Sequence, residues 1–121
     1  MPELFKKLTP YIGYDFESGC VITDDYRNFQ KTYFYCLDKM CKKNGWKLVK
    51  KMPNHYEFSC FIQCGEQFVY MSIDDVRYFA DEWHTRILIR TAVDASDYHG
   101  GRNQYTMLKD LETRLSEMFN S

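Results

Sequence analysis

Three histidines, five cysteines and the acidic pairs Asp74-Asp75 and Asp81-Glu82 are the first candidates in this chain for acid–base, nucleophilic or metal chemistry. The acidic pairs could bind a divalent ion, but surface loops are commonly acidic. His55, His84 and His99 could each act as a general base. A cysteine such as Cys20 or Cys64 could act as a nucleophile only with a histidine within hydrogen-bonding reach. These side chains follow no recognisable catalytic spacing. We therefore expect a protein that is not an enzyme and that uses no cofactor.

The cysteine spacing argues against a metal site and against a disulfide framework. Cys36 and Cys41 are five positions apart, and Cys60 and Cys64 are four apart, so the paired spacing of a zinc site is absent. These four cysteines stand where apolar residues are expected, which is typical of small core side chains. An odd number of cysteines also favours a reducing compartment, and we expect a cytoplasmic protein.

A polar segment from Asp94 to Tyr105 carries the best candidates for contact with a partner. Its Gly100-Gly101 pair permits backbone conformations that other residues resist, and long loops in small domains often carry function. Exposed tyrosines offer a large contact area at a low cost in conformational entropy. The alternative is a structured loop whose polar side chains bond to its own backbone. The predicted partner-binding residues are Tyr98, His99, Arg102 and Tyr105 in the loop, with Arg86 and Arg90 beside them.

The outward face of the expected sheet is a second candidate. Neighbouring antiparallel strands place their outward residues side by side, and this face combines basic with aromatic side chains. Such a surface can hold single-stranded nucleic acid, because cations neutralise phosphates and rings stack on bases. The residues predicted for this alternative are Lys47, Lys51, Phe61 and Tyr70. We favour burial of this face beneath the second helix, because apolar sheet faces usually seek cover.

Hydrophobic periodicity predicts the helices that frame these residues. One helix is expected from about Asp24 to Asn44, because apolar residues recur every three or four positions along it. Thr23 or Asp24 can cap its first turn, and Gly45 is a natural end. A last helix follows Thr106, which we expect to be its N-cap.

Four strands are expected between these two helices. Alternation of apolar and polar side chains is typical of strands with one buried face, and Val93 should face the core with Ile87 and Ile89. The expected strand ranges are 46–52, 55–64, 67–73 and 85–93, and a further short strand is suggested at 20–22. The predicted fold class is therefore α+β: a helix, a four-stranded antiparallel meander and a helix, in a single domain over residues 1–121.

Composition limits the classes of function. The chain has 121 residues, 45% of them hydrophobic, which suits one packed core. Sixteen basic and seventeen acidic residues exclude a histone-like polycation and a highly acidic mimic of DNA. Apolar runs are far shorter than the roughly 20 residues of a membrane helix, so we expect no membrane association. Ten tyrosines exceed what a small core can bury with every hydroxyl paired, which favours an interaction protein.

Three pieces of sequence carry a resemblance to known proteins. They are Val69-Tyr70-Met71-Ser72-Ile73, Ile87-Leu88-Ile89-Arg90-Thr91-Ala92 and Asp97-Tyr98-His99-Gly100-Gly101-Arg102-Asn103. This stretch resembles small uncharacterised accessory proteins of bacterial phages and conjugative elements. The resemblance implies an accessory protein of a mobile element, in a class that includes inhibitors of host defence such as anti-CRISPR proteins. It assigns no catalytic or binding residue.

These observations lead to one main expectation and two alternatives. We expect a non-enzymatic protein that binds a macromolecular partner, in the form of an inhibitor of a host nucleoprotein defence machine such as CRISPR. The first alternative is a module that binds single-stranded nucleic acid with the aromatic and basic sheet face. The second is a small enzyme that uses His99 or a cysteine.

Overall fold

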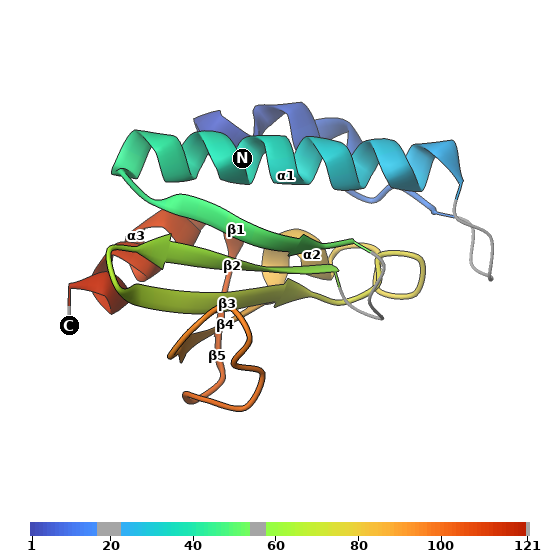
Figure 1. Cartoon of the computed structure of the whole chain (residues 1–121). Helices are drawn as coiled ribbons and strands as arrows, with labels where there is room; N and C mark the ends of the chain where they lie inside the picture. Colours follow the sequence, from blue (N-terminus) through green and yellow to red (C-terminus); the bar gives the residue numbers. More distant parts are fainter. Residues whose placement is uncertain (17–22, 54–57, 121) are drawn as a thin grey trace.

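The computed structural model describes residues 1–16, 23–53 and 58–120. A five-stranded antiparallel sheet forms one layer, and the helices pack on one face of it (Figure 1). The strands lie in sequence order and are β1 (Lys47–Met52), β2 (Phe58–Cys64), β3 (Gln67–Ile73), β4 (Ile87–Ala92) and β5 (Gln104–Thr106). The helices are the 3₁₀ helix η1 (Glu3–Tyr11), α1 (Asp24–Asn44), the short α2 (Glu82–Thr85) and α3 (Leu108–Phe119). The α+β class agrees with the sequence, whereas the expected four strands are five.

Helix α1 begins and ends where the sequence predicts. The hydroxyl oxygen of Thr23 accepts a hydrogen bond from the backbone N–H of Tyr26 at 3.2 Å, which caps the first turn. Gly45 ends the helix in the left-handed conformation, with φ of 73°. The buried side of the helix includes Tyr33 and Leu37, both completely shielded from solvent. The helix therefore contributes the centre of the hydrophobic core.

The core lies between the helices and the inner face of the sheet, and aromatic rings fill much of it. Tyr33 makes edge-on contacts with Phe29, Phe58 and Trp83, with ring centroids 5.1 to 6.1 Å apart. The hydroxyl of Tyr33 donates a hydrogen bond to the backbone carbonyl of Trp83 at 3.1 Å. This bond gives a deeply buried phenol a partner and connects α1 to α2.

Three cysteines are small core residues, as their positions in the sequence predict. Cys36, Cys41 and Cys60 are buried, and Cys64 is half-buried. Burial raises the pKa of Cys41 to about 12 and also raises the pKa of Cys60. Thiolate, the nucleophilic form, is therefore scarce at these positions near neutral pH. Cys20, His55 and the short strand suggested at 20–22 lie outside the described residues.

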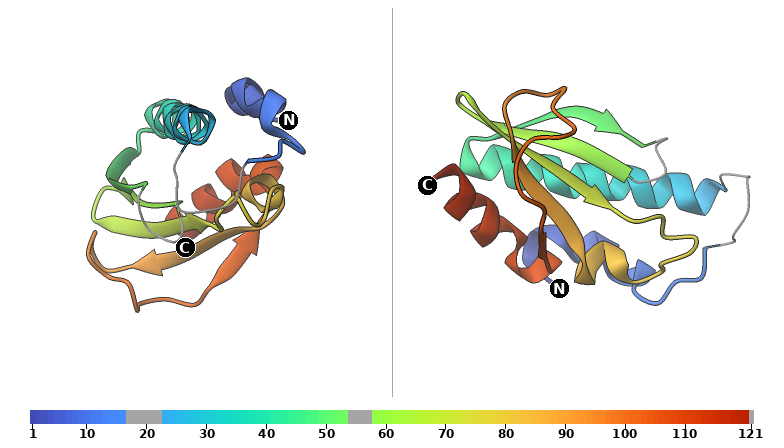
Figure 2. Two further views of the ribbon diagram at one scale, coloured as in Figure 1. Left: turned by 90° about the vertical axis from the view of Figure 1, so that its right-hand side faces the viewer. Right: turned by 90° about the horizontal axis from the view of Figure 1, so that it is seen from below.

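The expectation that the second helix covers the outward sheet face is wrong. Helix α3 packs on the inner face, on the same side as α1 (Figure 2). The Phe119 ring lies 5.3 Å from the ring of Trp46, and Asn44 donates to the Glu112 carboxylate at 2.7 Å. This position follows from the topology of the sheet. Strand β5 pairs with the edge of β4, and α3 begins directly after β5. Leu108, the first residue of α3, is buried in the core, so the helix continues on the inner face. The helices leave the opposite sheet face, here called the outer face, for another segment to cover.

Two local predictions near β4 and β5 are also wrong. Val93 was expected in the core, but it lies just beyond β4 and is 79% exposed. Thr106 belongs to β5 rather than to the cap of α3, and its hydroxyl donates to the backbone carbonyl of Met107. Met107 is the N-cap residue of α3 and provides no side-chain bond. A three-residue strand inside a polar segment gives too little alternation to be seen in the sequence.

Candidate interaction surface

Residues 93–103 connect β4 to β5 and run across the outer face of the sheet (Figure 2). We call this segment the strap. The carboxylate of Asp97 organises it by accepting backbone N–H bonds from Val93 at 3.0 Å, His99 at 3.1 Å and Gly100 at 2.6 Å. Asp94 accepts a further bond from the backbone of Ser96. The strap is thus a structured loop whose own side chains satisfy its backbone, which is one of the two forms that the sequence allowed.

The two glycines let the strap approach its neighbours closely. A Cβ atom on Gly100 would lie 2.0 Å from the Asp97 carboxylate. A Cβ atom on Gly101 would lie 2.3 Å from the backbone oxygen of Thr91, and Gly101 also has a φ of 68°. Positive φ and missing space both require glycine at position 101. The Gly100-Gly101 pair therefore has a local structural role in positioning the strap against β4.

Tyr98 is the side chain with which the strap covers the sheet. Its ring packs edge-on against Phe61 of β2, at 5.6 Å, and against Tyr70 of β3, at 6.1 Å. Its hydroxyl approaches the sulfur of Met52 at 3.2 Å. Phe61 is consequently 0% exposed and Tyr70 only 8% exposed. The outer face is covered after all, by a loop instead of a helix.

Arg90 of β4 holds the strap against the sheet. Its guanidinium lies 4.4 Å from the centre of the Tyr70 ring, and it donates hydrogen bonds to the backbone carbonyl of Tyr98 and to Asn103. The sequence predicted Arg90 as a contact to a partner. In the structure this side chain is half-buried and contacts Tyr70, Tyr98 and Asn103 of the same protein. Arg90 therefore helps to position Tyr98.

The remaining predicted contact residues stay accessible. Tyr98 keeps part of its ring exposed, and His99 and Arg102 are exposed beside it on the strap. Tyr105 of β5 is exposed with the Arg86 guanidinium 4.2 Å from its ring centre. Arg86 also lies 3.7 Å from the Asp74 carboxylate. We call the five residues Tyr98, His99, Arg102, Tyr105 and Arg86 the strap surface.

A β-bulge in β1 changes which lysines face the strap. Pairing with β2 shifts between Val49 and Met52, and Lys50 takes up a positive φ of 49°. The ammonium of Lys50 consequently lies 5.1 Å from the Tyr98 ring centre and 6.0 Å from that of Phe61. Strict alternation placed Lys51 on this face, which is wrong, because its ammonium lies over Phe34 of α1. Strict alternation did not place Lys50 on this face, because a Lys-Lys pair gives no sign of a bulge.

The structure separates the residues predicted for nucleic-acid binding. Lys47 is exposed and pairs with Gln63, whereas Lys51 lies on the helix side of the sheet. Phe61 and Tyr70 lie next to each other but beneath Tyr98, where no base could stack on them while the strap is in place. The four residues therefore form no common open surface.

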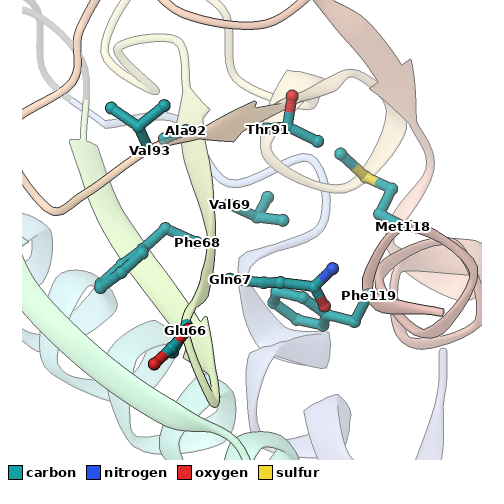
Figure 3. A pocket seen from close by; sticks show the side chains of 9 residues that line it. All are labelled: Glu66, Gln67, Phe68, Val69, Thr91, Ala92, Val93, Met118 and Phe119. Carbon is teal, nitrogen blue, oxygen red and sulfur yellow. The ribbon is translucent and has the colours of Figure 1, made fainter. Parts of the chain in front are cut away.

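A groove of about 370 Å³ opens where β3 and β4 approach the end of α3 (Figure 3). It is lined by Glu66, Gln67, Phe68, Val69, Thr91, Ala92, Val93, Met118 and Phe119. The one titratable side chain among them is Glu66, so this groove offers no pair of groups for acid–base chemistry. In the described part of the chain, no three His, Cys, Asp or Glu side chains gather closely enough to hold a metal ion. Within the same residues, no helix is long and apolar enough to cross a membrane.

We expect acid to weaken the attachment of the strap. Backbone N–H bonds, first that of Val93, lower the pKa of Asp97 in the folded protein. A lowered folded-state pKa stabilises the folded strap above the carboxyl's ordinary value of about 3.9, and this contribution is lost as the pH falls through the folded-state pKa. The amide signal of Gly100, followed by NMR from pH 7 to pH 2, measures the change. Asp97→Asn should weaken the strap at pH 7 and remove most of its acid response; an unchanged acid response in this variant would contradict the role of Asp97.

No family model, curated protein or solved structure matches this chain. The function is therefore argued from the strap surface itself.

Proposed function

We propose that this protein is a non-enzymatic interaction module that binds a protein or nucleoprotein partner through the strap surface. The observation that carries this proposal is the fixed presentation of exposed Tyr, Arg and His side chains on a strap that three separate anchors hold. Those anchors are the Asp97 carboxylate, the Gly100-Gly101 approach to β4 and the Arg90 contact with Tyr98. A surface that is rigid before binding loses less entropy when a partner arrives.

The chemistry of the strap surface favours a partner face with carboxylates or phosphates near apolar groups. Arg102 and His99 can donate hydrogen bonds, and Tyr98 and Tyr105 add flat contact area beside them. Tyrosine and arginine are also the residues that most often dominate the energy of protein interfaces. Inhibition of a host nucleoprotein machine is the most specific form of this proposal. It is supported by the resemblance of residues 69–103 to accessory proteins of mobile elements.

The strap surface is tested with a variant that leaves the strap's anchors intact. His99→Ala combined with Arg102→Ala removes two exposed side chains, whereas Tyr98→Ala would also uncover Phe61 and Tyr70. We expect this double variant to fold normally and to lose at least tenfold in affinity for the partner. The measurement is capture from nuclease-treated bacterial lysate, read by mass spectrometry, followed by titration with the purified captured protein.

The matched control is Tyr35→Ala combined with Lys39→Ala, which removes an exposed tyrosine and its neighbouring cation from α1. A captured protein that is retained by the control and lost with the strap variant supports the proposal. Equal capture by both variants would contradict it. Nucleic acid recovered with proteins that disappear on digestion, with binding that weakens steeply with salt, would favour the alternative of a nucleic-acid-binding module.

A further inference from the structure

The turn between β3 and α2 exposes two adjacent aromatic side chains. Tyr78 is 60% exposed and Phe79 is 50% exposed. Exposed aromatic pairs are informative, because large apolar groups left in water mark interaction sites more often than single aliphatic residues do. Neither residue belongs to the strap surface, although Arg86 of that surface lies 3.7 Å from the Asp74 carboxylate where this turn begins. The turn itself lies away from the strap, beside the start of α1 (Figure 1).

The turn that carries these rings is built to be rigid. The backbone carbonyl of Asp75 accepts N–H bonds from Tyr78 at 3.0 Å and Phe79 at 2.9 Å. The Asp75 carboxylate accepts a hydrogen bond from the backbone N–H of Arg77. It also accepts hydrogen bonds from the Arg77 guanidinium at 2.6 to 3.2 Å, and the side chains of both residues are largely shielded from solvent. Arg77 also lies 5.1 Å from the ring centre of Tyr26, which fixes the turn to α1. The backbone that carries the two rings is therefore held in one arrangement, and the Arg77 guanidinium also lies 5.9 Å from the ring centre of Tyr78.

Two further segments join this turn at the end of the molecule where α1 begins, at the right of Figure 1. The backbone N–H of Gly13 donates to the Asp81 carboxylate at 2.8 Å, which places the exposed Ile12 next to the turn. The hydroxyl of Tyr14 donates to the Asp25 carboxylate in the first turn of α1. The exit of η1, the start of α1 and the turn at 74–81 thus form one continuous end.

Carboxylates are numerous on the segments that form this end. Those that are at least partly exposed are Asp15, Asp24, Asp25, Asp74, Asp81 and Glu82. The nearby basic side chains are fewer: Arg77 is paired with Asp75, Arg86 lies near Asp74, the His84 ring lies 3.5 Å from Asp81, and Arg27 is exposed on α1. We call this surface the acidic aromatic end.

We propose that the acidic aromatic end is a second interaction surface, whose partner is a basic protein surface with an apolar pocket. Tyr78 and Phe79 would enter the pocket, and the surrounding carboxylates would face lysines and arginines of the partner. Charge complementarity carries this assignment, since an end with more carboxylates than basic groups repels nucleic acid and anionic surfaces. Rings held in place before binding act as anchors at a low cost in entropy.

The test uses a defined probe in place of an unidentified partner. A cationic amphipathic peptide of alternating arginine and leucine is titrated into ¹⁵N-labelled protein, and its anionic counterpart with glutamate in place of arginine is the matched peptide control. We expect the cationic peptide to shift the amide signals of residues 11–15 and 75–82, with an affinity that falls as salt is added. Tyr78→Ala combined with Phe79→Ala should weaken this binding at least tenfold, whereas Tyr78→Phe should retain it.

The controls keep the proposal falsifiable. Both replaced side chains are exposed, so the double variant is expected to fold, and its amide spectrum away from the turn confirms this. Tyr35→Ala with Lys39→Ala should bind the cationic peptide like the unchanged protein. Equal affinity of the Tyr78 and Phe79 variant, shifts confined to other surfaces, or stronger binding of the anionic peptide would overturn the proposal. Shifts of residues 75–82 with protein concentration alone would also overturn it, because the occupant would then be a second copy of the chain.

Discussion

Phe61→Ala is expected to destabilise the protein by about 3–5 kcal/mol, the usual cost of removing a fully buried phenylalanine. Phe61 faces away from the helices, but the Tyr98 ring covers it and leaves it 0% exposed. The substitution removes contacts to Tyr70 of the neighbouring strand as well as to the strap. Thermal unfolding should shift down by roughly 10–20 °C for a chain of this length. Circular dichroism and urea titration both measure this change.

Phe68→Ala is the matched control for this experiment. Phe68 lies on the same outer face, one strand away, but the strap's aromatic contacts do not include it and it is only half-buried. Its removal should cost about 1 kcal/mol, because less apolar surface is returned to water. If both substitutions cost the same small amount, Phe61 is not covered in solution. The outer face would then be open, and nucleic-acid bases could stack on Phe61 as the nucleic-acid-binding alternative requires.

Gly101→Ala should cost roughly 3 kcal/mol and should release the strap. An alanine here must adopt a positive φ, and its Cβ would also collide with the backbone oxygen of Thr91. Because a side-chain rotation cannot relieve a backbone collision, the strap itself has to move. Hydrogen exchange should therefore show lost protection in residues 93–103 before any loss in the core.

Gly65→Ala separates the two causes. Gly65 also has a positive φ, of 61°, but a Cβ atom there would have no neighbour within 4 Å. Its replacement should cost only the conformational term, about 1 kcal/mol, and should leave protection of the strap unchanged. A Gly101→Ala variant no less stable than Gly65→Ala would show that the close approach of the strap to β4 is absent in solution.

The elements that local signals define could be predicted from the sequence. Helix α1 has a capping threonine at its start, a stripe of apolar residues along it and a glycine at its end, and the structure has all three. The strands β2 and β3 were recognisable from alternation, and their inner residues lie in the core as expected. Such features depend on residues close together in the chain, which a sequence shows directly.

Features set by distant contacts could not be predicted in this way. The bulge at Lys50, the side of the sheet chosen by α3 and the covering of Phe61 by Tyr98 each depend on how separate segments meet. One extra residue in β1 moves Lys51 to the other face, so an argument from alternation fails at that point. The alternation of apolar and polar residues also does not distinguish an aromatic ring covered by a loop from one exposed to water.

The candidate site divides in the same manner. His99 and Arg102 are exposed on the strap, as expected for contact residues, and Tyr105 is exposed beside Arg86. Tyr98 and Arg90 have structural roles that the sequence does not indicate, because their contacts hold the strap on the sheet. Tyr78 belongs to the surplus of tyrosines that the sequence predicts to be partly at the surface, whereas the sequence shows Phe79 only as part of a connection. Their exposure follows from the Asp75 and Arg77 contacts, which fix the turn with both rings outward.

The bulge in β1 and the shortness of β5 have a consequence for how the molecule behaves in concentrated solution. Exposed sheet edges can pair with strands of other molecules and so begin aggregates. One edge here is β1, which is interrupted at Lys50 and carries three lysines, and the other is β5, with three residues. A strand from another molecule would meet a bulged edge with three lysines at β1. At β5 it would meet too few backbone N–H and C=O groups to pair with. Growth of the sheet from one molecule to the next is therefore disfavoured at both edges.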